Sequence, residues 1–325
     1  AITVVMSAFA FFWVDRVVAT LASENRTNRI NAKLAEIDAS RALIEQKCLA
    51  LAGLFSRLPF IQEAYQLAHS GDMSVETDPQ VESGRDILKR ECGPFSAGLL
   101  ATTGEKSFQL HFHLPTSRSF WRAWQPEQKR SDDLSSFRRT VVEINRGEHR
   151  PIAGVEVGVG GFVIRGLAAV QFADGTHAGS VETMWPYDPL VLTAKSDASQ
   201  NFAVFMRASH LDIAKGLKDE TAHPRVGSDY VMTASTDRER ACRLLDPEAL
   251  AAGAASRHTY ARDGHHITVF PVTDHGGASI GAIAYISDER SLVAHIAALR
   301  WSLAGGSAAL VAVLADLGEQ HAADP

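Results

Sequence analysis

The spacing of apolar residues between positions 30 and 58 constrains the fold of this chain most strongly. Nine positions follow one another at intervals that alternate between four and three residues: Ile30, Leu34, Ile37, Arg41, Ile44, Cys48, Leu51, Phe55 and Leu58. This spacing places them on one face of a helix, with Arg41 as the interruption. We therefore predict a long helix over most of Arg29–Leu58. Its apolar face can pack on its own domain, pair with the same helix of a second subunit, or do both.

Two uncharged apolar segments lie near the ends of the chain. They are Ala1–Val14 (AITVVMSAFAFFWV) and Trp301–Ala315 (WSLAGGSAALVAVLA). A membrane-spanning helix needs about 20 residues, so we interpret the first segment as a truncated membrane helix. A signal-peptide hydrophobic region would look similar, but no small-residue cleavage site precedes the helical pattern. We expect both segments to be helices that end on the same side of the molecule, at a shared membrane. The tail after Ala315 departs from this pattern, because it carries acidic residues and no Lys or Arg, whereas a cytoplasmic flank is expected to be basic.

The overall composition excludes several classes of protein. The chain has 325 residues and a net charge of −6, which argues against a general nucleic-acid binder. The cysteines Cys48, Cys92 and Cys242 form no CxxC pair, so neither a disulfide framework nor a zinc–thiolate site is indicated. The sequence contains no GxSxG or HExxH motif, and we predict no catalytic activity.

A change of hydrophobic period marks the start of a sheet. Gln80–Cys92 has a helical pattern, and period-2 alternation then predicts strands at Ser96–Thr102 and Ser107–His113 around a turn at residues 103–105. On the second strand, Phe108, Leu110 and Phe112 face one way, and Gln109, His111 and His113 face the other. We expect Pro115 to end this strand, Thr116–Trp124 to form a short helix, and Gln125–Ser136 to be a loop.

Two further groups of strands follow. Gly160-Gly161 within Gly154–Phe172 predicts a hairpin that pairs Val157 with Ile164 and Glu156 with Arg165, before a strand at His177–Met184. A similar order then recurs, and the following list gives its elements: a strand at Asp229–Ser235, a helix at Arg238–Ala251, and strands at Ser256–Arg262, His265–Thr273 and Ser279–Ser287. Antiparallel sheets with helices on one side indicate an α+β fold of two tandem PAS-like modules on a long N-terminal helix.

The predicted domain boundaries follow from this order. We expect a truncated transmembrane helix at residues 1–20 and a long helical region at residues 21–78. A membrane-distal module at residues 79–195 and a membrane-proximal module at residues 196–288 come next. A C-terminal helix at residues 289–325 includes the second apolar segment.

Several stretches of the chain resemble a known family. They read HFHLPTSRSFWRAWQPEQ, DDLSSFRRTVVEINR, GVEVGVGGFVIRGLAAV and HAGSVE. Together with the element order, they resemble the double Cache sensor domains, of the third type, of bacterial chemoreceptors and two-component sensor kinases. The resemblance covers about Asn28–Asp288. It implies an extracytoplasmic sensor domain without a specified ligand.

The candidate site lies after the first group of strands. Arg118, Trp121 and Arg122 are spaced to share one face of the predicted helix. Two guanidinium groups beside an indole suit a carboxylate or phosphate. Alternatively, these arginines lie on a surface helix and pair with Glu127, Asp132 or Asp133. Phe120 and Trp124 are expected in the core.

The predicted strand that ends at His113 adds two histidines to this candidate site. His111 and His113 share a strand face and can both point into a cavity. A His-x-His pair can chelate a transition metal, but no third ligand is marked nearby in the sequence. We therefore predict hydrogen-bonding or packed histidines, no metal and no cofactor. Arg138, Glu156 and Arg165 complete the predicted ligand-binding set, and Glu182 is a weaker candidate.

These observations favour a membrane-anchored sensor domain of a bacterial signal transducer. We expect its first module to bind a small, anionic molecule in the periplasm, above the inner membrane. We also expect a homodimer formed through the long N-terminal helix, and no nucleic-acid partner. The alternative is an extracytoplasmic binding or scaffold protein without an output domain, which the tail without basic residues favours.

Overall fold

The computed structural model describes residues 2–105 and 108–322. Ala1 and Ser107, which begin a predicted membrane helix and a predicted strand, lie outside the described residues. Helix α1 (Ile2–Phe55) has 54 residues, which corresponds to about 80 Å at 1.5 Å per residue. The apolar seam is buried at Ile30, Ile37, Cys48 and Phe55. The predicted long helix is therefore confirmed, and its seam packs on the sheets of its own chain.

The first sheet is antiparallel and has the strand order β2-β1-β5-β4-β3. Its strands are β1 (Gln109–His113), β2 (Ser119–Arg122), β3 (Ile152–Gly158), β4 (Gly161–Gln171) and β5 (His177–Pro186). One face packs on α1 and on helices α2 (Pro59–Ser70) and α3 (Pro79–Thr103). Helix α4 (Arg139–Arg146) packs on the other face. We call residues 59–186 the far module.

The second sheet has six strands in the order β7-β8-β6-β11-β10-β9. They are β6 (Gln200–Arg207), β7 (Arg225–Val226), β8 (Tyr230–Ser235), β9 (His258–Arg262), β10 (His265–Thr273) and β11 (Ser279–Asp288). One face packs on α1 and on α5 (Asp188–Thr193), which links the sheets, and the other packs on α6 (Arg238–Leu244) and α7 (Pro247–Ala255). We call residues 200–288 the near module. Two antiparallel sheets on a long helix confirm the predicted α+β architecture.

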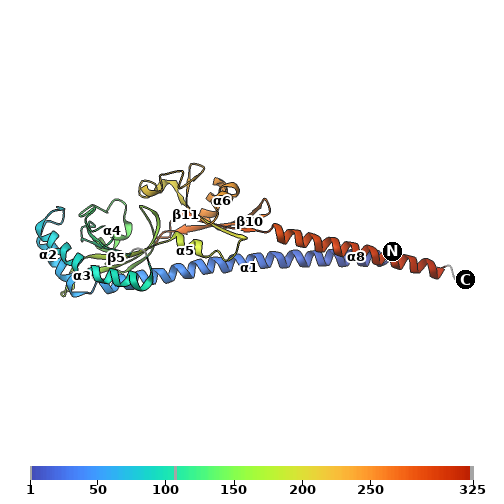
Figure 1. The fold of residues 1–325 in the computed structure, drawn as a ribbon, viewed down its shortest axis with the longest axis horizontal. Helices are drawn as coiled ribbons and strands as arrows, with labels where there is room; N and C mark the ends of the chain where they lie inside the picture. Colours follow the sequence, from blue (N-terminus) through green and yellow to red (C-terminus); the bar gives the residue numbers. More distant parts are fainter. Residues whose placement is uncertain (1, 106–107, 323–325) are drawn as a thin grey trace.

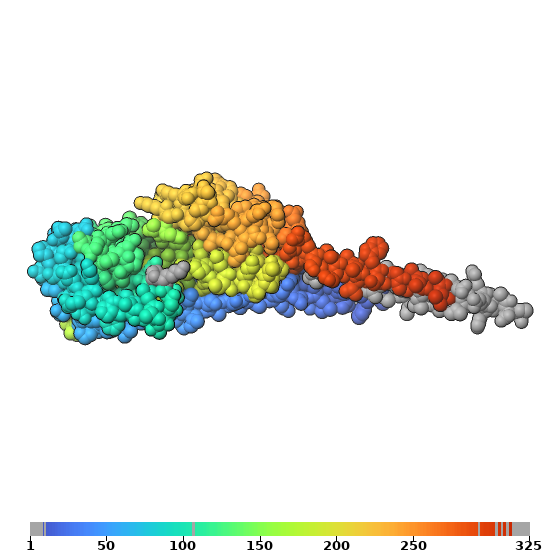
Figure 2. Space-filling model, in the orientation of Figure 1, coloured from blue at the N-terminus to red at the C-terminus, as the bar shows by residue number. Residues whose placement is uncertain are grey.

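Both ends of the chain leave the molecule in the same direction (Figure 1). Helix α8 (Arg290–Ala322) follows the near module and runs beside α1. Arg300 of α8 pairs with Asp15 of α1. The near module lies between this helical pair and the far module (Figure 2). Of the helices in the described part of the chain, none combines the length and the apolar character that crossing a membrane requires.

The predicted strand at Ser96–Thr102 is wrong. Helix α3 continues through Pro94 to Thr103. Gly104 has a φ of 70°, and its N–H donates to the Leu100 carbonyl. This left-handed glycine is a helix C-cap rather than a hairpin turn, so the residues before it belong to a helix.

The predicted helix at Thr116–Trp124 is also wrong. The Leu114 N–H donates to the Arg118 carbonyl at 2.8 Å, and Ser117 has a φ of 62°. A turn that ends in a left-handed residue is a common three-residue hairpin connection. Pro115 therefore turns the chain back, and the Arg/Trp segment becomes strand β2 against β1.

The register of the β3–β4 hairpin differs from the predicted one. Gly158 pairs with Gly161, and Glu156 lies opposite Val163 rather than Arg165. The turn is therefore centred on Val159-Gly160. Glu156 and Arg165 are diagonal neighbours in this register, and diagonal side chains on one sheet face still reach one another.

Candidate functional site

The far module contains a cavity of about 340 Å³ on the sheet face opposite α1. Strands β1 to β5, the loop between β2 and α4, and the β3–β4 hairpin all contribute to its wall. Ile213 is the one lining residue from the near module among the described residues. Apolar walls come from Trp124, Leu134, Phe137, Val157, Phe162, Val163, Met184 and Pro186. Mostly apolar walls with a few convergent polar groups are typical of small-molecule sites.

The charged groups that line the cavity are mainly cationic. The wall includes the cationic side chains of Arg122, Lys129, Arg138 and Arg165 and one carboxylate, that of Asp132. Arg122 reaches both carboxylate oxygens of Asp132, at 3.1 and 3.2 Å, and donates to the Lys129 carbonyl at 2.6 Å. Guanidinium groups with remaining donors suit a carboxylate or phosphate. The wall therefore favours an anionic ligand.

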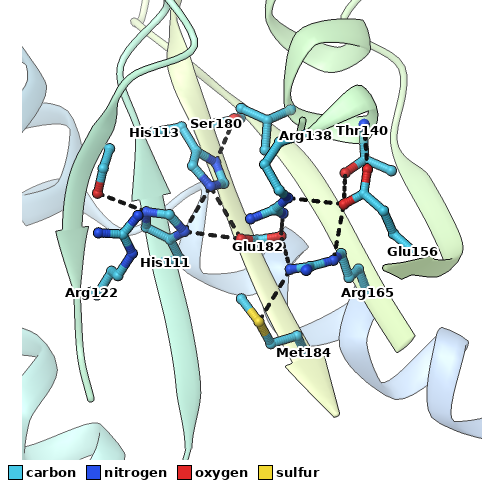
Figure 3. Close-up of polar contacts among 12 residues, drawn as sticks. His111, His113, Arg122, Arg138, Thr140, Glu156, Arg165, Ser180, Glu182 and Met184 are labelled. Atoms are coloured by element: carbon cyan, nitrogen blue, oxygen red, sulfur yellow. Dashed lines mark hydrogen bonds and ion pairs between the residues drawn. The ribbon is translucent and has the colours of Figure 1, made fainter. Parts of the chain in front are cut away.

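A network of buried charges lies against the wall of this cavity (Figure 3). Glu182 on β5 is fully buried, with two histidines on one side and two arginines on the other. Its Oε1 lies 3.0 Å from His111 Nδ1 and 3.2 Å from His113 Nε2. Its Oε2 accepts from Arg138 Nη2 at 2.5 Å and from Arg165 Nη1 at 3.2 Å.

Glu156 is the second carboxylate of this network. Its Oε2 accepts from Arg138 Nε at 2.9 Å, and its Oε1 accepts from the Thr140 backbone N–H at 3.0 Å. Arg165 Nε lies 3.0 Å from the same Oε2 but is not aligned for a hydrogen bond, so it has no acceptor among the described residues. Two carboxylates and two guanidinium groups thus balance one another.

The environment shifts the pKa values of these groups. Burial is the largest influence on the pKa of Glu182 and raises it, but Arg138 and Arg165 together outweigh it and hold this pKa well below its usual range. Burial lowers the pKa of His111 well below its usual value and also lowers that of His113. At neutral pH, the network therefore holds an ionised Glu182 beside two neutral imidazoles.

The structure brings together only part of the predicted site. His111, Arg122, Arg138 and Arg165 line the cavity. His113 and Glu156 lie behind this wall, where they contact the same buried network. The alternation predicted for β1 is confirmed, because Phe108, Leu110 and Phe112 lie in the core with α1 to α3.

Arg118 and Trp121 do not line the cavity. Arg118 donates to the Ser131 carbonyl at 2.7 Å, and Trp121 packs against Phe112 in the core. For Trp121 the physical reason is the strand geometry of β2, in which neighbouring side chains point to opposite faces, so Trp121 lies opposite to Arg122. Arg118 precedes β2 and forms an isolated β-bridge with Asp133. Phe120 lies in the core as predicted, whereas Trp124, also predicted there, lines the cavity.

Sequence reasoning missed Lys129 and Ile213, among other lining residues, and gave Glu182 little weight. Lys129 lies in a polar loop and Ile213 lies in the near module, so no local pattern marks either of them. Glu182 was ranked low because it stands alone in an apolar strand. An acidic residue within such a strand is itself a signal, since a buried carboxylate needs partners.

Comparisons with known proteins place the chain in a family. A profile described as the double sensory domain of two-component sensor kinases matches residues 105–288. No curated protein matches the chain.

Solved structures with a related fold include sensor domains of signalling proteins. The sensor domain of the histidine kinase DctB from V. cholerae is 10% identical, with a TM-score of 0.47 over 80% of this chain and 96% of that one. The ligand-binding domain of the chemoreceptor CtaA from Pseudomonas fluorescens, solved with L-serine, is 14% identical, with a TM-score of 0.35 over 81% of this chain and 98% of that one. Because the profile covers more than half of the 325 residues, the chain belongs to the family of double sensory domains of two-component sensor kinases.

Proposed function

We propose that this chain is the extracytoplasmic, membrane-anchored sensor part of a bacterial signal transducer, either a sensor histidine kinase or a chemoreceptor. Its ligand is a small anionic molecule that binds in the far-module cavity. The observation that carries the proposal is the wall of this cavity, which holds four cationic side chains and one carboxylate. Even with the buried Glu156 and Glu182 counted, the cationic groups outnumber the carboxylates by four to three. The sensor part itself has no catalytic role.

The position of the cavity suggests how binding reaches the helices. Ile213 of the near module lines the cavity, and the Gly216 N–H donates to the Val159 carbonyl at 2.9 Å. The His275 N–H donates to the Val155 carbonyl at 3.0 Å. A ligand that repositions the β3–β4 hairpin therefore acts on the near module, which leads into α8. Such a ligand signals only if it binds one arrangement of the hairpin more tightly than the other.

The second part of the proposal concerns the oligomeric state. Leu21, Leu43 and Leu54 on α1 are each more than half exposed. They lie at multiples of eleven residues, a spacing that keeps them close to one helix face. We propose that this face pairs with the same face of a second copy.

Thermal shift with the purified chain is the first test of the ligand. A panel of mono- and dicarboxylates, amino acids and phosphate monoesters covers the anionic classes, and amines and purines serve as the contrast. A ligand at 100 times its dissociation constant adds about 2.7 kcal/mol to the unfolding free energy. We expect stabilisation by members of the anionic set. Stabilisation by cationic amines alone would reject the anionic class.

Two arginine variants test the position of the site. Arg122→Gln removes a cation from the cavity wall, and we expect a roughly tenfold to hundredfold loss of affinity for the anion found in the screen, since a charge-assisted bond contributes about 1.5–3 kcal/mol. Arg118→Gln is the matched control, because Arg118 lies four residues earlier in the same segment and does not line the cavity. Titration calorimetry measures both. Equal losses in the two variants would place the ligand elsewhere.

A further inference from the structure

Three buried donor atoms in the far module form a compact triangle. His111 Nδ1 lies 3.0 Å from Glu182 Oε1 and 3.0 Å from His113 Nε2, and the third edge, from His113 Nε2 to Glu182 Oε1, is 3.2 Å. Among the described residues, this is the one group of three side chains with ligand atoms near enough to share a metal ion. Figure 3 shows the two rings and the carboxylate converging on one point between β1 and β5.

The dimensions of the triangle suit a transition metal. Zinc binds imidazole nitrogen and carboxylate oxygen at about 2.0–2.2 Å in tetrahedral geometry. Two ligand atoms of such a site lie roughly 3.3–3.5 Å apart. The three edges therefore need to lengthen by only a few tenths of an ångström. Two imidazoles and one carboxylate also match the ligand preference of Zn²⁺ and its neighbours, whereas Mg²⁺ and Ca²⁺ favour all-oxygen sites.

Neighbouring side chains hold each ligand in the required orientation. The outer nitrogens of the rings, His111 Nε2 and His113 Nδ1, lie 2.9 Å from Ser119 Oγ and 3.0 Å from Ser180 Oγ. Partners of this kind fix the ring orientation of metal-binding histidines. Arg138 and Arg165 occupy the other carboxylate oxygen. The inner nitrogens and Glu182 Oε1 consequently face one another.

We propose that His111, His113 and Glu182 bind one divalent transition metal of the zinc class. This site adjoins the anion cavity, but its three ligands are not among the four cationic side chains that we propose for the organic anion, and zinc binding can be measured without that anion. The cavity gives the ion a route to the ligands, because His111 lines its wall. Three protein ligands leave a fourth position for water or an anion. Since the two guanidinium groups already balance the two carboxylates, the added charge favours an anionic fourth ligand.

Without a metal, the same atoms form a hydrogen-bonded cluster. Each ring can donate one N–H to Glu182 Oε1, and Asn145 Nδ2 donates to Ser180 Oγ at 2.9 Å. That arrangement satisfies the carboxylate and needs no ion. In the metal-free cluster, the inner ring nitrogens carry the donated protons. A bound metal requires both of these nitrogens to be unprotonated.

Titration of the chelator-treated full chain with Zn²⁺ alone tests the proposal. We expect one ion per chain in calorimetry, and competition with a chromophoric chelator gives the affinity. X-ray absorption of the loaded wild-type protein should show two imidazole ligands at about 2.0–2.1 Å. This measurement needs no variant. A spectrum dominated by oxygen ligands, or by a single imidazole, would overturn the proposal.

Two variants locate the ion. His111→Asn and His113→Gln each replace the ring nitrogen that faces the metal position by a neutral amide, which is a weaker zinc ligand than imidazole. Removal of a hydrogen-bond partner of a metal ligand lowers metal affinity about 10–100-fold. Replacement of the ligand itself should cost more, and we expect each variant to bind Zn²⁺ at least a hundredfold more weakly. His295→Gln, at an exposed position on α8, should bind Zn²⁺ as the wild type does. Unchanged zinc affinity in both site variants would reject the site, whatever the anion titrations show.

Discussion

Glu182 links both halves of the buried network, since it contacts two histidines and two arginines and is fully buried. Glu182→Gln leaves Arg138 and Arg165 without half of their compensating charge. Removal of one partner of a buried ion pair costs roughly 3–5 kcal/mol. We therefore expect Glu182→Gln to lower the unfolding free energy by this amount, as measured by urea denaturation.

The control for this variant is Glu148→Gln. Glu148 pairs with Arg150 at the surface, where both side chains are more than 70% exposed. Substitutions at such positions change stability by no more than about 0.5 kcal/mol. If both variants unfolded at the same urea concentration as the wild type, the buried network would make no net contribution to folding.

His177 makes the stability of the far module depend on pH. Burial, and then the neighbouring His149 and His69, lower the pKa of His177 to about 4 from an ordinary value of 6.5. Between these values the unfolded chain binds more protons than the folded one. The unfolding free energy should therefore be highest above pH 6.5 and decrease as the pH falls toward 4.

Substitution of His177 by Gln tests this origin. The ring donates from Nε2 to Asn145 Oδ1 at 3.0 Å, and a glutamine amide can replace that donor. We expect H177Q to make the pH profile between 6.5 and 4 less steep, with the other buried histidines accounting for the remaining slope, while His295→Gln leaves the profile unchanged. Identical profiles for H177Q and the wild type would assign the pH dependence to other groups.

At the scale of elements, the close packing of α1 on β4 depends on Gly166. A Cβ at Gly166 would lie 2.2 Å from the backbone nitrogen of Leu49. Nearby, the Thr183 hydroxyl donates to the Cys48 carbonyl at 2.8 Å. Gly166→Ala must therefore push the helix away from the sheet. We expect a loss of about 1–3 kcal/mol in the unfolding free energy, with a lower midpoint in thermal denaturation.

Gly53→Ala, in α1 itself, is the matched control. No atom lies within 4 Å of a Cβ built at Gly53. Replacing a helical glycine by alanine stabilises by roughly 0.5–1 kcal/mol. We expect the unfolding free energy to decrease in Gly166→Ala and to increase in Gly53→Ala. A stabilising Gly166→Ala would show that α1 does not pack closely on β4 at this point.

The elements that sequence predicted correctly are those with long, regular patterns. The seam of α1 and the apolar stretches of β10 and β11 each extend over many residues. The segment after Pro115 was assigned the wrong element, because Arg118, Trp121 and Arg122 fit a helix face as well as a short strand. Pairing with β1 decides in favour of the strand, and the local spacing of residues carries no information about that pairing.

The site shows the same division. Alternation along β1 was sufficient to place His111 and His113 on the face opposite Phe112. It could not show that Glu182 lies directly across from His111, because that pairing joins strands 71 residues apart. The sequence therefore marks Glu182 only as a weak candidate and does not show that it lies beside the two histidines.

At the scale of the whole molecule, the proposed dimer makes a prediction about mass. Leu43 and Leu54 are 68% and 58% exposed on α1. Leu43→Glu combined with Leu54→Glu places four carboxylates in the proposed interface. We expect analytical ultracentrifugation to give two copies for the wild type and one for the double variant.

A charge elsewhere on the surface controls for this experiment. Val75 is 45% exposed in the loop between α2 and α3. Val75→Glu should leave the mass at two copies. A single copy for the wild-type chain at all concentrations, or two copies for the double variant, would remove α1 as the interface.

The two helices at the end of the molecule start from different places. Helix α1 continues beneath both modules, whereas α8 begins at the near module (Figure 1), where Glu289 accepts from Arg26 Nε at 2.9 Å. Rigid movement of the entire molecule moves both helices together and leaves their relative height, measured along the axis of α1, unchanged. Sliding of the near module along α1 alters that height. Any component that reads only the offset between these neighbours is therefore insensitive to motion of the domain as a body and responds to its internal rearrangement alone.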